Sequence, residues 1–337
     1  MAMREGAILT ITTDTGLLGI GEMAPLPAFG GENLVEAQKA LADVIPRLRE
    51  SPLDTALQLI QHVPSSVACG LEMALLDIQS KRDGYDIGML LSDAPLRDVV
   101  PVNAVIGAES VEDVFISALT AKQRGFSCVK LKVGGTKNLL VEIERIAAAR
   151  SALGSDIHLR LDANEAWTLE EANTLLSRCA PYRIQYVEQP LQRNNLTGMQ
   201  QLRRTISIPI AADEAIRDLE SARRVMRYGA ADILIIKPQL AGGLYTSRQI
   251  IAEATQRGIQ CVVTTTIESG ISLAATLHLI AASPEITLAC GLATQHLLVD
   301  TLIREEFVIR ESMMKVPSGP GLGVTLDEEA LHIYGTQ

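Results

Sequence analysis

The sequence predicts an α/β protein in which a TIM-like (β/α)7β barrel follows an N-terminal α+β capping domain. From about residue 99, eight short apolar runs alternate with amphipathic helical stretches. Strands that are buried on both faces and joined by helices are typical of parallel sheets, and this number of them favours a closed barrel. The 337 residues accommodate a barrel of roughly 250 residues and a smaller domain.

Residues 1–98 are predicted to form the capping domain, an antiparallel sheet with helices. Two strand-like runs flank the turn Asp14-Thr15-Gly16, and a loop rich in proline and glycine separates them from two stretches with helical periodicity. In order, these are strands 7–13 and 17–22, the loop 24–31, and helices 33–49 and 66–82.

Residues 99–299 are predicted to form the barrel, and residues 300–337 an irregular segment that returns to the capping domain. The predicted strands are 99–106, 128–133, 157–161, 184–187, 208–212, 232–236, 260–264 and 287–290. The predicted helices are 110–124, 138–153, 168–179, 195–204, 217–228, 243–257 and 271–282.

Composition excludes several classes of protein. The net charge of −10 argues against a nucleic-acid binder, and no apolar run approaches the ~18 residues of a membrane span. The N-terminus has no basic region followed by an apolar core, so no secretory signal is expected and a cytoplasmic location is predicted. The five scattered cysteines are expected to be buried, unpaired thiols.

A charged residue stands at the end of five successive predicted strands. The spacing between successive members of the series is 30, 26, 25 and 24 residues, each one strand-helix unit; the series is Lys132, Asp162, Glu188, Asp213 and Lys237. In a barrel these carboxyl ends share one rim, which is where the active site lies.

The three carboxylates among them predict a metal site. Unpaired at one rim, Asp162, Glu188 and Asp213 would repel one another, and a divalent cation would relieve this repulsion. All-oxygen ligation without cysteine or histidine favours Mg²⁺, with Mn²⁺ possible in its place. The alternative is an ion-pair network with the neighbouring lysines.

The two lysines suit proton transfer to and from a bound acid. Lys132 and Lys237 belong to the second and sixth strands, on opposite sides of a barrel, and Lys130 shares the face of Lys132. A cation beside Lys132 would lower the pKa of its ammonium and so help it act as a base near neutral pH. Alternatively, Lys130 could serve only in a structural ion pair. Asn164 and Glu214 are supporting candidates, or else cap and turn residues.

Four residues are candidates for contact with a substrate. Ser269 and Gly270 open the helix after the seventh strand, where backbone donors could bind an anionic group, or where Ser269 could be an ordinary helix cap. Arg160 precedes Asp162 on the same strand face, and Phe29 lies in the proline- and glycine-rich loop.

Other catalytic patterns are missing from the sequence. The five histidines do not have the spacing of metal ligands, and no nucleophile-elbow or dinucleotide-binding motif is present.

These residues resemble the enolase superfamily, in its muconate-lactonizing-enzyme-like branch. The resemblance rests on K-x-K at 130–132, D-A-N at 162–164, V-E-Q-P at 187–190, A-D-E at 212–214 and I-K-P at 236–238. It implies a Mg²⁺-dependent enzyme acting on a small-molecule carboxylate. Members usually begin with a further strand upstream of Arg4, so the leading sheet is expected to lack one strand.

Within the branch, residues 21–30 resemble the loop of the o-succinylbenzoate synthases of cyanobacterial and plant type. That resemblance implies a lyase that dehydrates 2-succinyl-6-hydroxy-2,4-cyclohexadiene-1-carboxylate by syn elimination, in menaquinone or phylloquinone biosynthesis. Lys132 would remove the proton and protonate the departing hydroxyl, while Lys237 stays cationic.

Other activities stay open on the same scaffold. They are N-succinylamino acid racemisation, muconate cycloisomerisation and, more remotely, a non-catalytic binding barrel. Dipeptide epimerases carry a D-x-D after the eighth strand, whereas this chain has Gly291-Leu292-Ala293-Thr294 there. The oligomeric state is left open.

Overall fold

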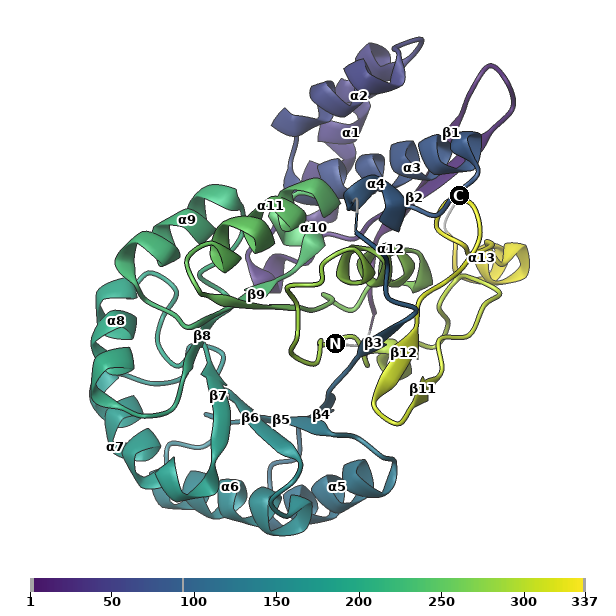
Figure 1. Cartoon of the computed structure of the whole chain (residues 1–337). Coiled ribbons are helices and arrows are strands. Elements are labelled where there is room, and N and C mark those ends of the chain that lie inside the picture. Colours follow the sequence, from purple (N-terminus) through teal and green to yellow (C-terminus); the bar gives the residue numbers. More distant parts are fainter. Residues whose placement is uncertain (1–2, 93, 336–337) are drawn as a thin grey trace.

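Seven parallel strands form the centre of the molecule, with helices arranged around them and a smaller helical layer with a hairpin at one end (Figure 1). The structure is a computed structural model and describes residues 3–92 and 94–335. Each strand is hydrogen-bonded to its neighbour in the sequence, in the order β10-β9-β8-β7-β6-β5-β4. The strands are β4 (Ala104–Ile106), β5 (Cys128–Lys132), β6 (His158–Asp162), β7 (Ile184–Glu188), β8 (Ile210–Ala212), β9 (Ile233–Ile236) and β10 (Gln260–Val263).

The sheet closes into a ring through Cys290 and Gly291. Cys290 forms a bridge to Val102 before β4, and Gly291 forms one to Thr264 after β10. The eighth strand predicted before Gly291 is therefore wrong as a continuous strand. In the described part of the chain, the bridges here are those of Cys290 and Gly291, and the carbonyl of the preceding Ala289 accepts a hydrogen bond from Arg160 inside the barrel at 2.7 Å.

The seven predicted barrel helices are confirmed to within two residues at each end. A short helix, α10 (Pro238–Ala241), additionally follows β9. Every residue of α12 (Gly270–Ala281) is buried, because this helix lies between the barrel and the capping layer (Figure 1). The other predicted helices are α5 (Val111–Gln123), α6 (Leu139–Leu153), α7 (Leu169–Cys179), α8 (Leu196–Thr205), α9 (Leu219–Tyr228) and α11 (Leu244–Thr255).

The first predicted barrel strand, 99–106, divides in two. Its first half, β3 (Val99–Pro101), pairs with β12 (Met313–Lys315) of an antiparallel hairpin completed by β11 (Ile309–Arg310). The Val102 N–H donates to the Ser312 carbonyl at 2.8 Å, which holds this stretch against the hairpin. The segment 300–337 is thus more regular than predicted, and it also contains α13 (Glu328–Tyr334).

The first hundred residues form a hairpin packed on helices, as predicted. Strand β2 (Leu18–Met23) lies directly on the backbone of helix α3 (Ser65–Asp83). The approach is so close that a Cβ at Gly21 would stand 2.0 Å from the Gly70 carbonyl oxygen. The elements are β1 (Ala7–Thr12), β2 (Leu18–Met23), α1 (Leu34–Leu48), α2 (Leu53–Leu59), α3 (Ser65–Asp83) and α4 (Gly88–Leu91). Short 3₁₀ turns are η1 (Pro27–Phe29), η2 (Ile60–His62), η3 (Ala180–Tyr182) and η4 (Gln295–Leu297).

An apolar layer fills the barrel below its carboxyl rim. It consists of Tyr186, Ala211, Ile233, Ile235 and Val262. Alternate residues of a strand share a face. Glu188, Asp213 and Lys237 stand two positions after Tyr186, Ala211 and Ile235, and they therefore point inward at the rim. The five cysteines are buried and unpaired, as predicted.

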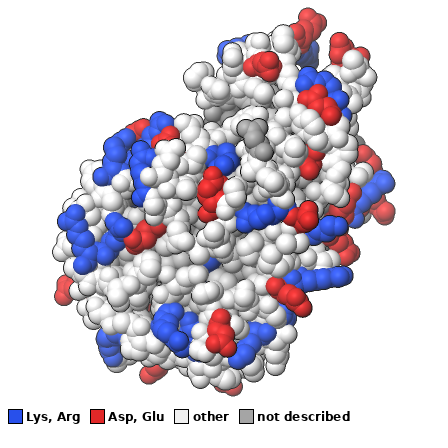
Figure 2. Space-filling model, viewed as in Figure 1, with Lys and Arg blue, Asp and Glu red and all other residues white. Residues whose placement is uncertain are grey.

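Charged side chains of both signs are interspersed over the face seen in Figure 2. Within residues 3–92 and 94–335, no helix combines the length and the apolar character that crossing a bilayer requires.

Candidate active site

The charged residues predicted at the strand ends lie together at the carboxyl rim of the barrel. Lys132 stands opposite Asp162 in the β5–β6 ladder, and Asp162 stands opposite Glu188 in the β6–β7 ladder. Asp213 directly follows β8, and Lys237 directly follows β9. Parallel strands end at one edge, so the regular spacing in the sequence becomes proximity in space.

Each of the three carboxylates is paired with a lysine ammonium. Nζ of Lys130 lies 2.9 Å from Oδ2 of Asp162 and 3.0 Å from Oε1 of Glu188. Nζ of Lys132 lies 2.6 Å from the same Asp162 oxygen. Nζ of Lys237 donates to both oxygens of Asp213, at 2.5 and 2.6 Å. Lys130 thus bridges two of the carboxylates.

Burial and mutual repulsion govern the ionisation of the rim carboxylates. Burial raises the pKa of Glu188 to about 8, and the charges of Asp162 and Asp213 add to this effect. Burial and the charge of Asp213 likewise raise the pKa of Glu214 to about 7. For Asp162, burial is outweighed by the two adjacent lysines, which lower the pKa of its carboxyl. The rim thus holds four carboxyl groups beside three lysines, and the proximity of the carboxyl groups to one another helps to raise the pKa of Glu188 and Glu214.

The carboxylates fit a hard divalent cation by their chemistry. Asp162, Glu188 and Asp213 are 1%, 1% and 3% exposed, and they offer oxygen ligands alone. Oε2 of Glu214 is buried and has no hydrogen-bond partner in the described part of the chain. Across those residues, no three aspartate, glutamate, histidine or cysteine side chains already converge as a metal site. The donors are present, but lysines hold them, so a metal shared by the three carboxylates stays a prediction.

The two lysines differ in accessibility. The side chain of Lys132 is 40% exposed, whereas that of Lys237 is 7% exposed. The ring of Phe29 lies over Lys237, with Nζ 4.6 Å from the ring centroid. Burial disfavours the charge on Lys237, but Asp213 outweighs it and raises the pKa of this ammonium. The loop predicted to contact the substrate thus covers one of the two lysines.

Asn164 and Glu214 connect to the accessible lysine. Lys132 donates to Oδ1 of Asn164 at 2.8 Å, and Nδ2 of Asn164 donates to Oε1 of Glu214 at 2.9 Å. Asn164 adopts a left-handed backbone conformation with φ of 42°, which asparagine tolerates better than most residues. Asn164 thus contacts the Lys132 ammonium directly, and Glu214 contacts Asn164.

Gln189 is a positioning residue that the sequence analysis did not single out. Its Oε1 accepts hydrogen bonds from the N–H groups of Asp213 and Ala215, at 2.9 and 3.3 Å. Its Nε2 donates to the carbonyl of Leu191 at 2.8 Å. A polar amide directly after a strand-end carboxylate was the available signal, because an amide buried there needs partners.

The N-terminus of α12 is occupied by the protein itself, and Ser269 caps this helix, because its hydroxyl accepts from the Ile271 N–H at 3.2 Å. The carboxylate of Glu22 accepts from the Ser269 N–H at 2.9 Å, the Ser269 hydroxyl at 2.8 Å and the Ser272 N–H at 3.1 Å. The Gly270 N–H donates to the carbonyl of Thr301 at 2.8 Å. A protein carboxylate from β2 therefore occupies the position predicted for a substrate carboxylate.

Arg160 is likewise not placed to contact a substrate. It is fully buried, and its guanidinium donates to Gln185 at 2.6 Å, to Asn103 at 3.2 Å and to the Ala289 carbonyl at 2.7 Å. Asn103 precedes β4 and Gln185 lies near the start of β7, so these partners belong to the amino end of the barrel. Arg160 is a structural residue beneath the rim.

Comparison with known families and proteins agrees with this geometry. A family model described as enolase C-terminal domain-like matches residues 115–330, and one for the MenC N-terminal domain matches residues 1–78. Muconate cycloisomerase 1 from Rhodococcus opacus is 30% identical over 97% of this chain and 90% of its own length. The L-Ala-D/L-Glu epimerase of Bacillus subtilis is 30% identical over 95% and 89%. The o-succinylbenzoate synthase of Thermobifida fusca is 36% identical over 64% and 65%.

Solved structures share the whole architecture. The muconate lactonizing enzyme from Pseudomonas putida has a TM-score of 0.92 at 26% identity, covering 98% of this chain and 95% of its own. A dipeptide epimerase from Enterococcus faecalis, complexed with Mg and the dipeptide L-Leu-L-Tyr, has a TM-score of 0.87 at 26% identity, covering 96% and 92%. The family match over most of the barrel, together with relatives of nearly full coverage, means that the chain belongs to the enolase superfamily and is an enzyme of that superfamily.

Proposed function

We propose that this chain is an o-succinylbenzoate synthase, which removes water from 2-succinyl-6-hydroxy-2,4-cyclohexadiene-1-carboxylate to yield 2-succinylbenzoate. The unequal accessibility of the two lysines carries the proposal. The Lys132 side chain is 40% exposed, while that of Lys237 is 7% exposed and lies beneath Phe29. A syn dehydration needs one base on one face of the substrate, whereas racemisation needs a base on each face. The arrangement suits one-base chemistry.

The capping domain and the end of the barrel support the same assignment. The MenC N-terminal domain model matches residues 1–78, which include the loop that carries Phe29. The segment Gly291-Leu292-Ala293-Thr294 offers no carboxylate to hold the amine of a dipeptide. An amine-free dicarboxylate therefore fits this chain better than a dipeptide does.

Asp162, Glu188 and Asp213 would hold a Mg²⁺ ion, and Mn²⁺ has the same preference for oxygen ligands. When bound, the ion supplies positive charge toward the substrate carboxylate as the α-proton leaves.

Lys132 is the acid and base of the proposed reaction. As the free amine it takes the α-proton, and the electron pair of the broken C–H bond moves onto the adjacent carboxylate of the substrate. The resulting ammonium then gives the proton to the hydroxyl on the same face. The electron pair returns to form a new ring double bond, the C–O bond breaks, and water leaves. The ring becomes aromatic and Lys132 returns to the amine. Asn164 accepts from Nζ of Lys132 at 2.8 Å and so limits its movement between the two steps.

Lys237 acts as a fixed positive charge. It lies on the side of the barrel away from Lys132, since strand β9 is separated from strand β5 by β6, β7 and β8. Preorganised charges of this kind stabilise developing negative charge without reorganisation, and removal of one such donor typically lowers the rate ~10²–10³-fold.

Racemisation or epimerisation is the second candidate. This candidate is favoured by the presence of a lysine on each side of the barrel rim. It is also favoured by similarity to the L-Ala-D/L-Glu epimerase of Bacillus subtilis, which is 30% identical. N-succinylamino acids would be the substrates of a racemase on this scaffold.

Parallel assays of the purified chain with Mg²⁺ distinguish the candidates. Formation of 2-succinylbenzoate is followed by ultraviolet absorption, and epimerisation of L-Ala-L-Glu and of N-succinylamino acids by polarimetry. The proposal predicts dehydration that is lost in Lys132→Ala and far more efficient than either epimerisation. Epimerisation without dehydration would refute it.

A further inference from the structure

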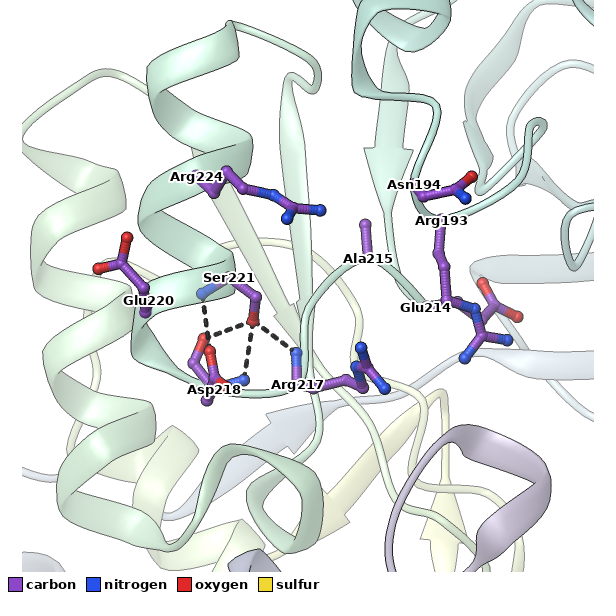
Figure 3. A pocket seen from close by; sticks show the side chains of 9 residues that line it. All are labelled: Arg193, Asn194, Glu214, Ala215, Arg217, Asp218, Glu220, Ser221 and Arg224. Carbon is purple, nitrogen blue, oxygen red and sulfur yellow. Dashed lines mark hydrogen bonds between the residues drawn. The ribbon is translucent and has the colours of Figure 1, made fainter.

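A cavity of about 290 Å³ lies beside the rim, and three arginines line it (Figure 3). Arg193 comes from the loop after β7, while Arg217 and Arg224 come from the loop after β8 and from α9. We propose that this cavity binds the second carboxylate of the substrate, the one on the succinyl chain. The inference rests on the proposed function and extends it by naming where the distal anion binds.

The arginines of the cavity are not all neutralised by the protein. Arg193 is engaged by Glu165, with contacts of 2.9 and 2.6 Å. Arg217 and Arg224, by contrast, form no ion pair with any residue in the described ranges. Two guanidinium groups at one cavity create a positive potential that favours an anion.

The two acidic residues at the start of α9 have partners other than the arginines of the cavity. Asp218 caps α9 by accepting from the Ser221 N–H at 2.7 Å, as the dashed lines of Figure 3 indicate. Glu220 pairs with Arg227 at 2.7 Å.

The loop that covers Lys237 also contacts this cavity. The Phe29 ring lies 4.6 Å from Nζ of Lys237. At the next residue, Gly30, a Cβ would stand 3.0 Å from Nη1 of Arg193 and 3.2 Å from Cδ of Arg217. Consecutive residues of one loop therefore touch the reacting end and the arginine-lined end of a single site.

Glu214 connects the arginine-lined cavity to Lys132. It lines the cavity, and its Oε1 accepts from Asn164, which in turn accepts from Lys132. A substrate that spans both ends would have its reacting carbon near Lys132 and its chain directed along Glu214.

A carboxylate is the anion that this arrangement suits. The planar guanidinium group forms paired hydrogen bonds with a carboxylate. The N-terminus of α12, the other position considered for the distal carboxylate, is occupied by Glu22. The ring carboxylate belongs at the rim, so the succinyl carboxylate is the group left for Arg217 and Arg224.

Calorimetric binding with Mg²⁺ present tests the inference without turnover. The probes are 2-succinylbenzoate, which has both carboxylates, and benzoate, which lacks the succinyl chain. Arg217→Gln and Arg224→Gln should each weaken 2-succinylbenzoate binding about tenfold, since a hydrogen bond to a charged group contributes about that much. Benzoate affinity should not change, and Arg217→Lys should restore part of the loss.

Arg223→Gln is the matched control, because Arg223 is the neighbour of Arg224 on α9 but pairs with Glu253 at 2.6 Å. Thermal unfolding establishes that each variant is folded.

Equal affinity of wild type and both glutamine variants for 2-succinylbenzoate would overturn the inference. The proposed function would still stand in that case if the wild type dehydrates the cyclohexadiene substrate. A wild type that neither dehydrates the cyclohexadiene nor binds 2-succinylbenzoate would remove both. In a further titration, succinate is added to enzyme saturated with 2-succinylbenzoate. If succinate still binds, and this binding is lost in Arg217→Gln, the cavity binds a separate anion and the inference is overturned.

Discussion

Glu72 joins capping helix α3 to barrel helix α11, and its titration should be visible in the stability of the whole chain. Its carboxylate accepts from the Leu244 N–H and, at 3.4 Å, from the Tyr245 N–H at the N-terminus of α11. Glu72 is only 6% exposed. Burial raises its pKa from 4.5 to about 7, even though the two N–H donors favour the anion. The folded chain therefore binds this proton more tightly than the unfolded chain does.

The magnitude follows from the difference between the two pKa values. A rise from 4.5 to about 7 corresponds to about 3 kcal/mol. This stabilisation is present in full below pH 4.5 and is lost as the pH rises through about 7. Glu72→Gln keeps a neutral acceptor and has no proton to lose. The free energy of unfolding of the variant, relative to wild type, should therefore increase by about 3 kcal/mol between pH 4.5 and pH 8.

Urea unfolding at several pH values, with EDTA present, measures this difference. Glu112→Gln, which removes an exposed carboxylate from α5, is the matched control and should follow the wild-type curve. Parallel pH dependence of wild type and Glu72→Gln would refute the reasoning. It would mean that the helix N-terminus outweighs burial and keeps Glu72 ionised in the folded chain throughout.

Three further predictions concern packing, the covered lysine and the metal. Gly21→Ala would place a Cβ 2.0 Å from the Gly70 carbonyl oxygen, so chemical unfolding should show a loss of about 3 kcal/mol; an unchanged midpoint would contradict the packing of β2 on α3. Phe29→Ala uncovers Lys237 and should raise α-proton exchange at the second enantiomer of an N-succinylamino acid severalfold by NMR, whereas unchanged exchange would mean that the ring does not restrain this lysine. Mg²⁺ at a hundredfold excess over its Kd should stabilise the chain by about 2.7 kcal/mol in thermal unfolding; Asp162→Asn should abolish this gain, and an equal gain in the variant would place the metal elsewhere.

The sequence is informative where the structure depends on local pattern. A charged residue at the end of an apolar run identifies the rim, because each strand is short and buried on both faces. The step from Lys132 through Asp162 to Glu188 therefore translates directly into register, with each residue opposite the next. The barrel helices were predictable for the same reason, since their periodicity is a property of consecutive residues.

Contacts between distant segments leave no such local signal. Ser269 has the pattern of an anion-binding helix start, but its partner is Glu22, which lies 247 positions away. Arg160 alternates correctly with Asp162, yet a strand face alone does not tell whether a side chain points to the rim or to the opposite end of the barrel. The hairpin at 309–315 forms because it pairs with β3, which no pattern within the hairpin itself indicates.

The most direct test of the central claim asks which lysine removes a proton. Both enantiomers of an N-succinylamino acid are incubated with the chain and Mg²⁺ in D₂O, and exchange of the α-proton is followed by NMR. If Lys132 is the single base, exchange occurs at one enantiomer and disappears in Lys132→Ala. Efficient exchange from both enantiomers at a rate matching dehydration, with one of them lost in Lys237→Ala, would contradict the account and establish Lys237 as a second base.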